Sequence, residues 1–201
     1  MEQIETALNN SVATFCAFDG AKAVGMARLL GDGSMSFYVK DLAVRPDKNT
    51  NMEMHDIIAK LTAKDDKYAC AIADKIISES RDTDEWYEYF DAFASLLNHP
   101  KSLVRNRMVH ILAVNAQWDD EYRFAAILPE FLSHIMDEKP ITARQCIKTL
   151  ALVGQAKPQY IPRITEALRE ADLSKYKDSM CPLIEKDIAD TENTLLMLFP
   201  G

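Results

Sequence analysis

One helical pattern occurs twice in the chain. The segment SLVRNRMVHILAVNA begins at Ser102, and ITARQCIKTLALVG begins at Ile141, about 39 residues later. When the two segments are superposed, Arg105 meets Arg144 and apolar residues meet apolar residues. The matched apolar pairs are Val104 with Ala143, Met108 with Ile147, Ile111 with Leu150, and Leu112 with Ala151. A period of this length carried by helices predicts an α-solenoid, whose units bury their apolar faces only against neighbouring units.

The composition is that of a chain that folds, and it limits what the chain binds. At 201 residues there is room for one ordinary domain with a small appendage, or for one extended repeat array. Hydrophobic residues make up 48% of the chain, which suffices for a packed core. The formal net charge is −8. Because non-specific nucleic-acid affinity comes from Lys and Arg displacing counterions, this charge disfavours nucleic acid as the main partner, although it leaves room for a local basic stripe.

The cysteines and the opening residues favour a reducing compartment. Cys16, Cys70, Cys146 and Cys181 are far apart and form no CxxC pair, so isolated thiols are expected rather than disulfides or a metal site. The opening MEQIETALNN has neither the basic nor the apolar region of a secretory signal. The sequence contains no run of about 18 apolar residues that would span a membrane. We therefore expect a cytoplasmic protein.

Residues 1–50 differ from the rest of the chain because they are rich in strand-forming residues. Three runs, SVATFCAF, AVGMARLL and MSFYVKDLAV, lie between Ser11 and Val44 and are separated by DGAK and GDGS. Asp-Gly between β-rich runs is the strongest short-range signal of a hairpin. The segment is therefore predicted to form a small three-stranded antiparallel β-meander. Such a sheet needs a helix or a partner on its apolar face to be stable.

A set of short motifs in this segment points to a known enzyme family. The motifs are Asp19-Gly20, Val24-Gly25, Ala27-Arg28, Gly31-Asp32-Gly33, and Asp41-Leu42-Ala43-Val44 followed by Arg45-Pro46. With them, residues 11–46 resemble part of a GNAT-family N-acetyltransferase, from its second strand through its fourth. The resemblance implies that the backbone of Leu42, Ala43 and Val44 would contact the pantetheine arm of acetyl-CoA.

The loop that binds the pyrophosphate in that family has no counterpart in this sequence. After Pro46 the chain continues DKNTNMEMHDIIAKL, and no glycine occurs between Gly33 and Gly154. Glycines are needed there because side chains would keep backbone N–H groups away from the phosphates. We interpret residues 1–50 as a GNAT-like fragment joined, naturally or artificially, near residues 47–53 to a separate helical domain. No catalytic residue and no cofactor are assigned, and acetyl-CoA binding is kept as an alternative.

Residues 51–201 are predicted to form a helical repeat domain. The expected helices span 52–61, 66–77, 84–99, 102–115, 118–136, 140–153, 157–172 and 174–198, with a bend at Pro129. Short turns would pair them as four antiparallel hairpins. This pattern, with Val104-Arg105 and Ala143-Arg144 near the starts of second helices, resembles HEAT-like (armadillo-type) repeats over about residues 52–198. The resemblance implies a right-handed α-solenoid with atypical terminal repeats.

The second helices of the hairpins carry the candidate binding residues. Helical geometry places Arg105 and Arg144 at the edge of the buried stripe. These arginines either bond acidic or carbonyl groups in the turns between helices or contact a ligand. Two rows are expected to point away from the core, namely Asn106, His110 and Ala113, and Gln145, Thr149 and Leu152. The candidates for binding a partner are Arg105, Asn106, Arg107, His110, Gln145, Lys148 and Thr149. A solvated face without a ligand is the alternative.

Other reactive residue types carry no site signal. The four histidines make no i, i+4 pair and no HExxH motif, so no metal site is assigned. The acids of DTDEWYEYFD are expected to face a helix dipole in a first turn rather than to act in acid–base catalysis. The aromatic residues of the same segment, Trp86, Tyr87, Tyr89, Phe90 and Phe93, are expected in the core between repeats.

The sequence favours an interaction protein over an enzyme. The leading hypothesis is a non-catalytic scaffold that binds a protein or peptide through the concave face of HEAT-like repeats, and it rests on architecture. The alternatives are an acetyl-CoA-binding or acetyltransferase-related protein and a DNA-binding or DNA-repair solenoid. Strand 39–44 would be an unpaired sheet edge, which predicts either docking of the sheet onto the first helical hairpin or strand pairing in a homodimer.

Overall fold

The computed structural model describes residues 12–19, 22–31, 37–44 and 46–198, and it describes no side chains between 37 and 53. Contacts divide the chain into two units, Met1–Asp56 and Ile57–Gly201. The predicted boundary at residue 50 lies within helix α2 (Pro46–Leu61), so the division falls a few residues later than predicted. Most described residues are helical, as predicted.

The first unit contains an antiparallel sheet. Its strands are β1 (Ala13–Asp19), β2 (Lys22–Gly31) and β3 (Phe37–Val44), and they hydrogen-bond in the order β1-β2-β3. β3 is therefore an edge strand, as is β1. The turn positions Gly20 and Asp32-Gly33, and Arg45, lie outside the described residues. On β1, Phe15 and Phe18 are 60% and 63% exposed, so this strand presents large apolar side chains that the described residues leave uncovered.

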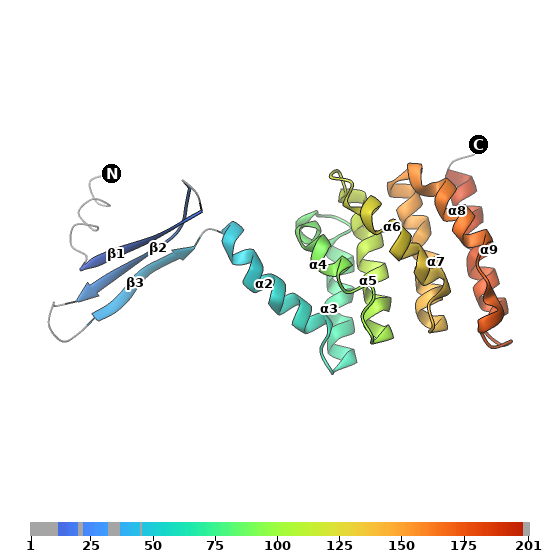
Figure 1. Cartoon of the computed structure of the whole chain (residues 1–201), viewed down its shortest axis with the longest axis horizontal. Helices are drawn as coiled ribbons and strands as arrows, with labels where there is room; N and C mark the ends of the chain where they lie inside the picture. The colour runs from blue at the N-terminus through green and yellow to red at the C-terminus, as the bar shows by residue number, and fades with distance from the viewer. Residues whose placement is uncertain (1–11, 20–21, 32–36, 45, 199–201) are drawn as a thin grey trace. The chain divides into compact units, whose positions relative to one another are not determined.

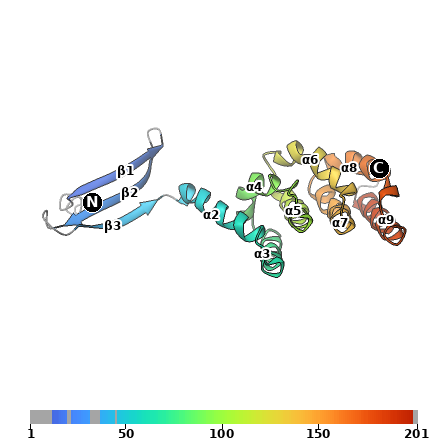
Figure 2. The ribbon, with the colours of Figure 1, turned by 60° about the horizontal axis from the view of Figure 1, so that its bottom comes forward.

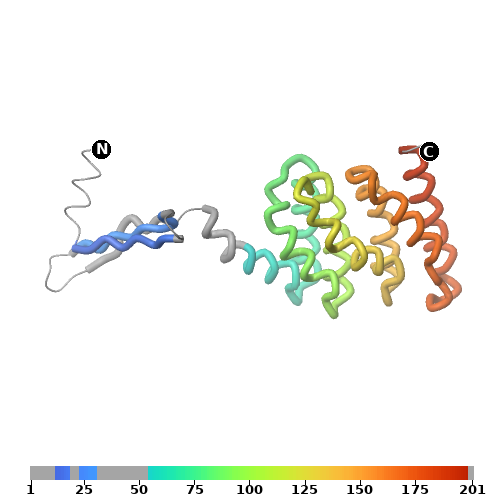
Figure 3. The backbone as a smooth tube through the Cα atoms, turned by 45° about the horizontal axis from the view of Figure 1, so that its top comes forward, coloured from blue at the N-terminus to red at the C-terminus, as the bar shows by residue number. Residues whose placement is uncertain are grey.

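The second unit is built from two layers of helices (Figure 1). The long helices α3 (Asp66–Glu79), α5 (Ser102–Asn115), α7 (Pro140–Ala156) and α9 (Cys181–Leu198) stand side by side in chain order. The shorter α4 (Phe90–Ala94), α6 (Arg123–Ser133) and α8 (Ile161–Arg169) form the second layer. Figure 2 separates the layers, and the trace in Figure 3 passes back and forth between them. Each long helix packs against the next one in the row.

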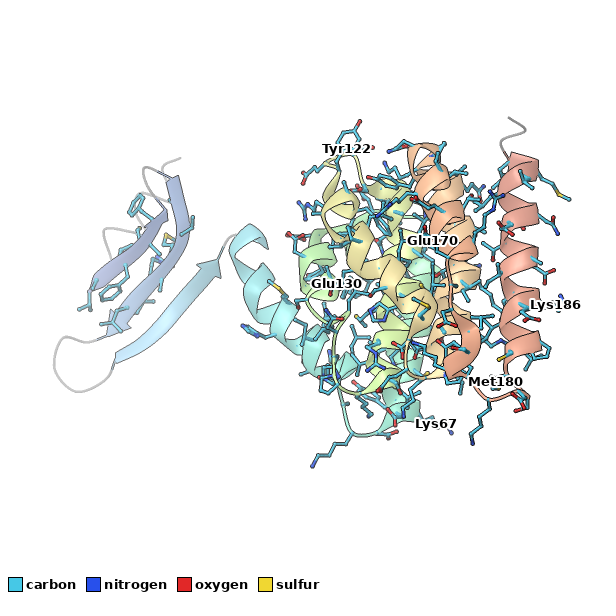
Figure 4. The ribbon with its side chains drawn as sticks, turned by 45° about the vertical axis from the view of Figure 1, so that its right-hand side comes forward. Lys67, Tyr122, Glu130, Glu170, Met180 and Lys186 are labelled. Atoms are coloured by element: carbon cyan, nitrogen blue, oxygen red, sulfur yellow. The ribbon has the colours of Figure 1, made fainter. Side chains whose placement is uncertain are left out.

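The second layer is more broken than predicted. The expected helix 84–99 is a 3-10 turn, Glu85–Tyr89, followed by the single short helix α4. The expected helix 118–136 begins only at Arg123, because Tyr122 adopts a left-handed conformation with φ 58°. Figure 4 shows the Tyr122 side chain projecting from this turn. α6 then continues through Pro129 to Ser133.

Two more helices of the second unit begin later than predicted. Helix α8 begins at Ile161, after a 3-10 turn at Pro158–Tyr160. The last helix, α9, begins at Cys181 rather than near Ser174, because Leu173–Lys175 forms a separate 3-10 turn. The Lys186 side chain projects from the side of α9 that faces away from α7 and pairs with Asp190 (Figure 4), while Leu196 and Met197 on the same helix are 60% and 83% exposed.

An aromatic column connects the elements of the second layer. The rings of Phe90 and Phe124 lie 6.0 Å apart, and the rings of Phe124 and Phe131 lie 5.2 Å apart. Tyr160 stacks on the other side of Phe124 at 6.1 Å. Ring pairs at these separations add about 0.5–1.5 kcal/mol beyond area burial. The column links α4, α6 and the turn before α8, so the short helices are held by their aromatic side chains.

Candidate functional site

The Arg105 side chain is buried and bonds to groups within the fold. It is 8% exposed, and Nε and Nη2 each donate a 2.7 Å hydrogen bond to the carboxylate of Asp137. Nη1 donates to the carbonyl oxygens of His99 and Pro100, at 2.9 and 3.2 Å. These partners lie in turns before α5 and α7, which matches the structural alternative stated for this arginine. The expectation that Arg105 contacts a partner protein is not supported, because Nε, Nη1 and Nη2 all bond to groups of these turns.

Arg144 is also bound within the fold, although to a different element. Its Nε donates to Oδ2 of Asp187 on α9 at 2.5 Å, and Lys148 lies 3.5 Å from the other oxygen of the same carboxylate. Tyr176 stands 39 residues after Asp137, and its hydroxyl donates to the Asp137 carbonyl oxygen. The position that corresponds to Asp137 one repeat length later is therefore a tyrosine and offers no carboxylate, and Arg144 pairs with Asp187 on α9.

Two further candidates are buried, contrary to prediction. Arg107 is 4% exposed and donates to the Leu61 carbonyl oxygen and to Asp66. Thr149 is 2% exposed, and its hydroxyl donates to the carbonyl oxygen of Cys146 at 2.8 Å. Ala113, from the expected outward row, is 1% exposed. The physical reason is that α5 and α7 each have a long neighbour on both flanks, so each helix buries more than the single stripe assumed for a hairpin helix.

The remaining candidates lie on α5 and α7, and one of them, His110, is close to Asp74 on α3, so we call this surface the α3–α5–α7 face. Asn106 and His110 on α5 and Gln145 on α7 are half-buried, and Lys148 is exposed. The Asn106 side-chain amide donates to the Ile141 carbonyl oxygen at 3.3 Å, which joins the beginnings of α5 and α7. The structure thus brings these residues onto neighbouring helices.

A hollow lies at one end of this face, where α5 and α7 finish. It encloses about 410 Å³. Its lining consists of Arg81, Ala113, Val114, Gln117, Leu152, Gln155 and Ala156. The alanines, Val114 and Leu152 supply an apolar floor, while one guanidinium and two amides supply polar groups. Sequence reasoning missed Arg81, Gln117 and Gln155, because helical periodicity selects no residue in a turn or at a helix end.

The polar groups of the hollow are only partly used. The Gln117 side-chain nitrogen donates to the carbonyl oxygens of Ser80 and Val114, at 2.8 and 3.1 Å, which leaves its side-chain oxygen as an acceptor. Within the described part of the chain, the Arg81 guanidinium forms neither an ion pair nor a hydrogen bond. Burial and the nearby Arg81 charge lower the pKa of His110, while Asp74 opposes them. The cation therefore faces this surface of α5.

A second group of titratable side chains is closed to ligands. His134 Nδ1 lies 3.0 Å from the Asp137 carboxylate, and Cys146 and Tyr176 lie around the same aspartate. Burial, with a smaller contribution from the Asp137 charge, raises the pKa of the Cys146 thiol far above its ordinary value. The thiol therefore stays protonated, and it has no exposed surface. This cluster supports the packing of α5 and α7 rather than nucleophilic chemistry.

No protein-family model, curated protein or solved structure matches this chain in the three comparisons made. Leu42, Ala43 and Val44, the residues implicated by the GNAT resemblance, lie in β3, where only the backbone is described. Across residues with a described placement, no three His, Cys, Asp or Glu side chains are grouped to hold a metal ion. None of the described helices has the length and apolar character needed to cross a membrane.

Proposed function

We propose that residues 57–201 form a HEAT-like α-solenoid that binds a peptide segment of a partner protein on the α3–α5–α7 face, without catalysis. The row of long helices supports this proposal, because each one contacts its neighbour and a second layer covers one side. The face left over carries residues of three neighbouring helices. Extended segments bind to such surfaces through repeated side-chain contacts.

The hollow at the ends of α5 and α7 is the observation that carries the proposal. It combines an apolar floor with a guanidinium and amide groups that have free hydrogen-bonding capacity. Sites that bind peptides need both, since apolar contact supplies affinity and a few polar groups fix orientation. Leu152, which is 38% exposed, lines the hollow together with the buried Ala113 and Val114 and gives it an accessible apolar surface.

A linear-peptide array probed with the full chain tests the proposal. Leu152→Arg places a long charged side chain in the hollow, and Ala126→Arg makes a matched change on an exposed position of α6. We expect the wild-type chain and the Ala126→Arg variant to select the same peptides, and Leu152→Arg to lose them. An array on which the wild-type chain selects nothing, or on which Leu152→Arg selects the same peptides, would refute the proposal.

The edge strand β3 supports a second, independent association. A three-stranded sheet is marginal alone, and unpaired edge groups are a template for another strand. We propose that two chains pair through β3 to form a homodimer. Sedimentation velocity over a wide concentration range tests this, and the Val39→Pro variant should shift toward monomer. A monomer at every concentration would eliminate the dimer.

A further inference from the structure

We propose that the hollow binds the free C-terminal residue of the partner peptide, with the carboxylate on Arg81 and the apolar side chain on Leu152. This inference rests on the proposed function and adds the chemistry of the ligand. It follows from the charge, the hydrogen-bonding groups and the size of the hollow.

The positive charge of the hollow favours an anionic ligand. Arg81 is the one cationic residue in its lining, and its guanidinium has no carboxylate partner among the described residues. By contrast, the arginines within the long helices, Arg105, Arg107 and Arg144, each form an ion pair with a carboxylate. A guanidinium fork matches a carboxylate through two parallel hydrogen bonds.

The hollow lies at the C-terminal ends of α5 and α7. Helix C-termini carry partial negative charge and disfavour an anion nearby. The chain itself has a net charge of −8. Attraction of a carboxylate to this hollow therefore depends on Arg81, and removal of that one charge should abolish it.

The amide groups match the backbone of one terminal residue. The free side-chain oxygen of Gln117 can accept from a peptide N–H, while its nitrogen is already used by Ser80 and Val114. Gln155, exposed beside it, can pair with the next carbonyl oxygen. The apolar floor around Leu152 then receives the side chain.

The compactness of a chain terminus favours it over an internal acidic residue. A C-terminal residue carries its N–H, its side chain and its carboxylate on one Cα atom. An internal Asp or Glu would present the carboxylate in place of the apolar side chain, so a second residue would be needed to fill the floor. A hollow of about 410 Å³ has room for this arrangement, in which one guanidinium and one apolar floor are both occupied by a single residue.

Two peptide arrays that differ in one functional group test the inference. Both carry the same random hexapeptides ending in Leu, Ile, Val or Phe, one with a free carboxylate and the other with a C-terminal amide. We expect the full wild-type chain to bind the acids about tenfold more tightly than the amides, as loss of a charge-assisted bidentate pair predicts. The Arg81→Gln variant should lose this preference, and Arg163→Gln, on the α8 layer, should keep it.

The outcomes distinguish failure of the terminal-carboxylate inference from failure of peptide binding itself. Equal binding of acids and amides overturns the terminal-carboxylate inference but leaves peptide binding intact. Tighter binding of amidated peptides that contain an internal Asp overturns it in the same way. Failure of the wild-type chain to bind either array overturns both proposals. The comparison of acids with amides uses the wild-type chain alone, so it stands even if Arg81→Gln does not fold.

Discussion

Arg105 on α5 and Asp137 in the turn before α7 form a bidentate pair, Nε to Oδ2 and Nη2 to Oδ1, with both distances 2.7 Å. The side chains are 8% and 2% exposed. Asp137 also accepts from the Lys139 backbone N–H at 2.8 Å and contacts His134. One carboxylate thus ties the start of α7 to the start of α5, and it fixes the spacing of two neighbouring long helices.

Removal of Arg105 should destabilise the helical unit strongly. The Arg105→Met variant leaves the Asp137 charge buried without its main partner, which costs about 3–5 kcal/mol. Arg163→Met is the matched control, because the Arg163–Glu166 pair is 63% and 52% exposed and contributes about 0–1 kcal/mol. Urea unfolding followed by circular dichroism measures both. Equal losses in the two variants would contradict the assignment.

The Asp137 carboxylate should make the free energy of unfolding decrease at acidic pH. Burial opposes its charge, but the hydrogen bonds from Arg105, the Lys139 N–H and His134 outweigh burial and hold the pKa of Asp137 below its ordinary range. A depressed folded-state pKa adds stability above the unfolded pKa of about 3.9, and this stability is lost as pH falls through the folded pKa.

Comparison of the wild-type chain with Asp137→Asn isolates that contribution. The difference in unfolding free energy should be constant from neutral pH down to about pH 4 and should shrink on further acidification. Urea midpoints measured at a series of pH values provide the test. A difference that grows toward low pH would contradict the lowered folded-state pKa of Asp137.

Asp119 should be a strong helix-start residue for α6. It is fully buried, accepts from the backbone N–H groups of Arg123 and Phe124 at 2.7 and 3.0 Å, and accepts from the Tyr87 hydroxyl at 2.6 Å. Asp119→Ala removes three acceptor contacts and should cost about 2 kcal/mol. Asp120→Ala, next to it but 96% exposed, should cost well under 1 kcal/mol. Thermal unfolding of both variants distinguishes a cap from a merely acidic turn.

Gly154 should be required for the close approach of α7 and α9. A methyl group at this position would overlap Cδ2 of Leu195, which is 2% exposed, and would press on Ile161. Gly154→Ala gains about 1 kcal/mol of helix propensity but incurs about 1–3 kcal/mol of overpacking, so we expect net destabilisation.

The double variant Gly154→Ala with Leu195→Ala provides the control for that clash. The cost of Gly154→Ala should largely vanish in the Leu195→Ala background, because the overlapping atom is gone. Chemical unfolding of the four chains gives the coupling energy. Additive effects would mean that the two positions do not meet.

Part of the candidate site was accessible from sequence. Helical periodicity predicted that Asn106, His110 and Gln145 point away from the core, and all three are half-buried. It was wrong for Arg107 and Thr149, because it treated each helix as having one buried side. The structural alternative for Arg105 was correct, since a stem at the edge of an apolar stripe can turn inward when an acid lies in the adjacent turn.

The sequence by itself determined that residues beyond 51 form helices, because periodicity and turn residues act through local backbone geometry. Tertiary structure decided which sides of those helices remain available, because α3 and α7 flank α5. It also decided which arginines are satisfied. Arg105 and Arg107 find partners 32 and 41 residues away, while Arg81 has no ion-pair partner among the described residues. Such pairings depend on side chains distant in sequence, and no local pattern encodes them.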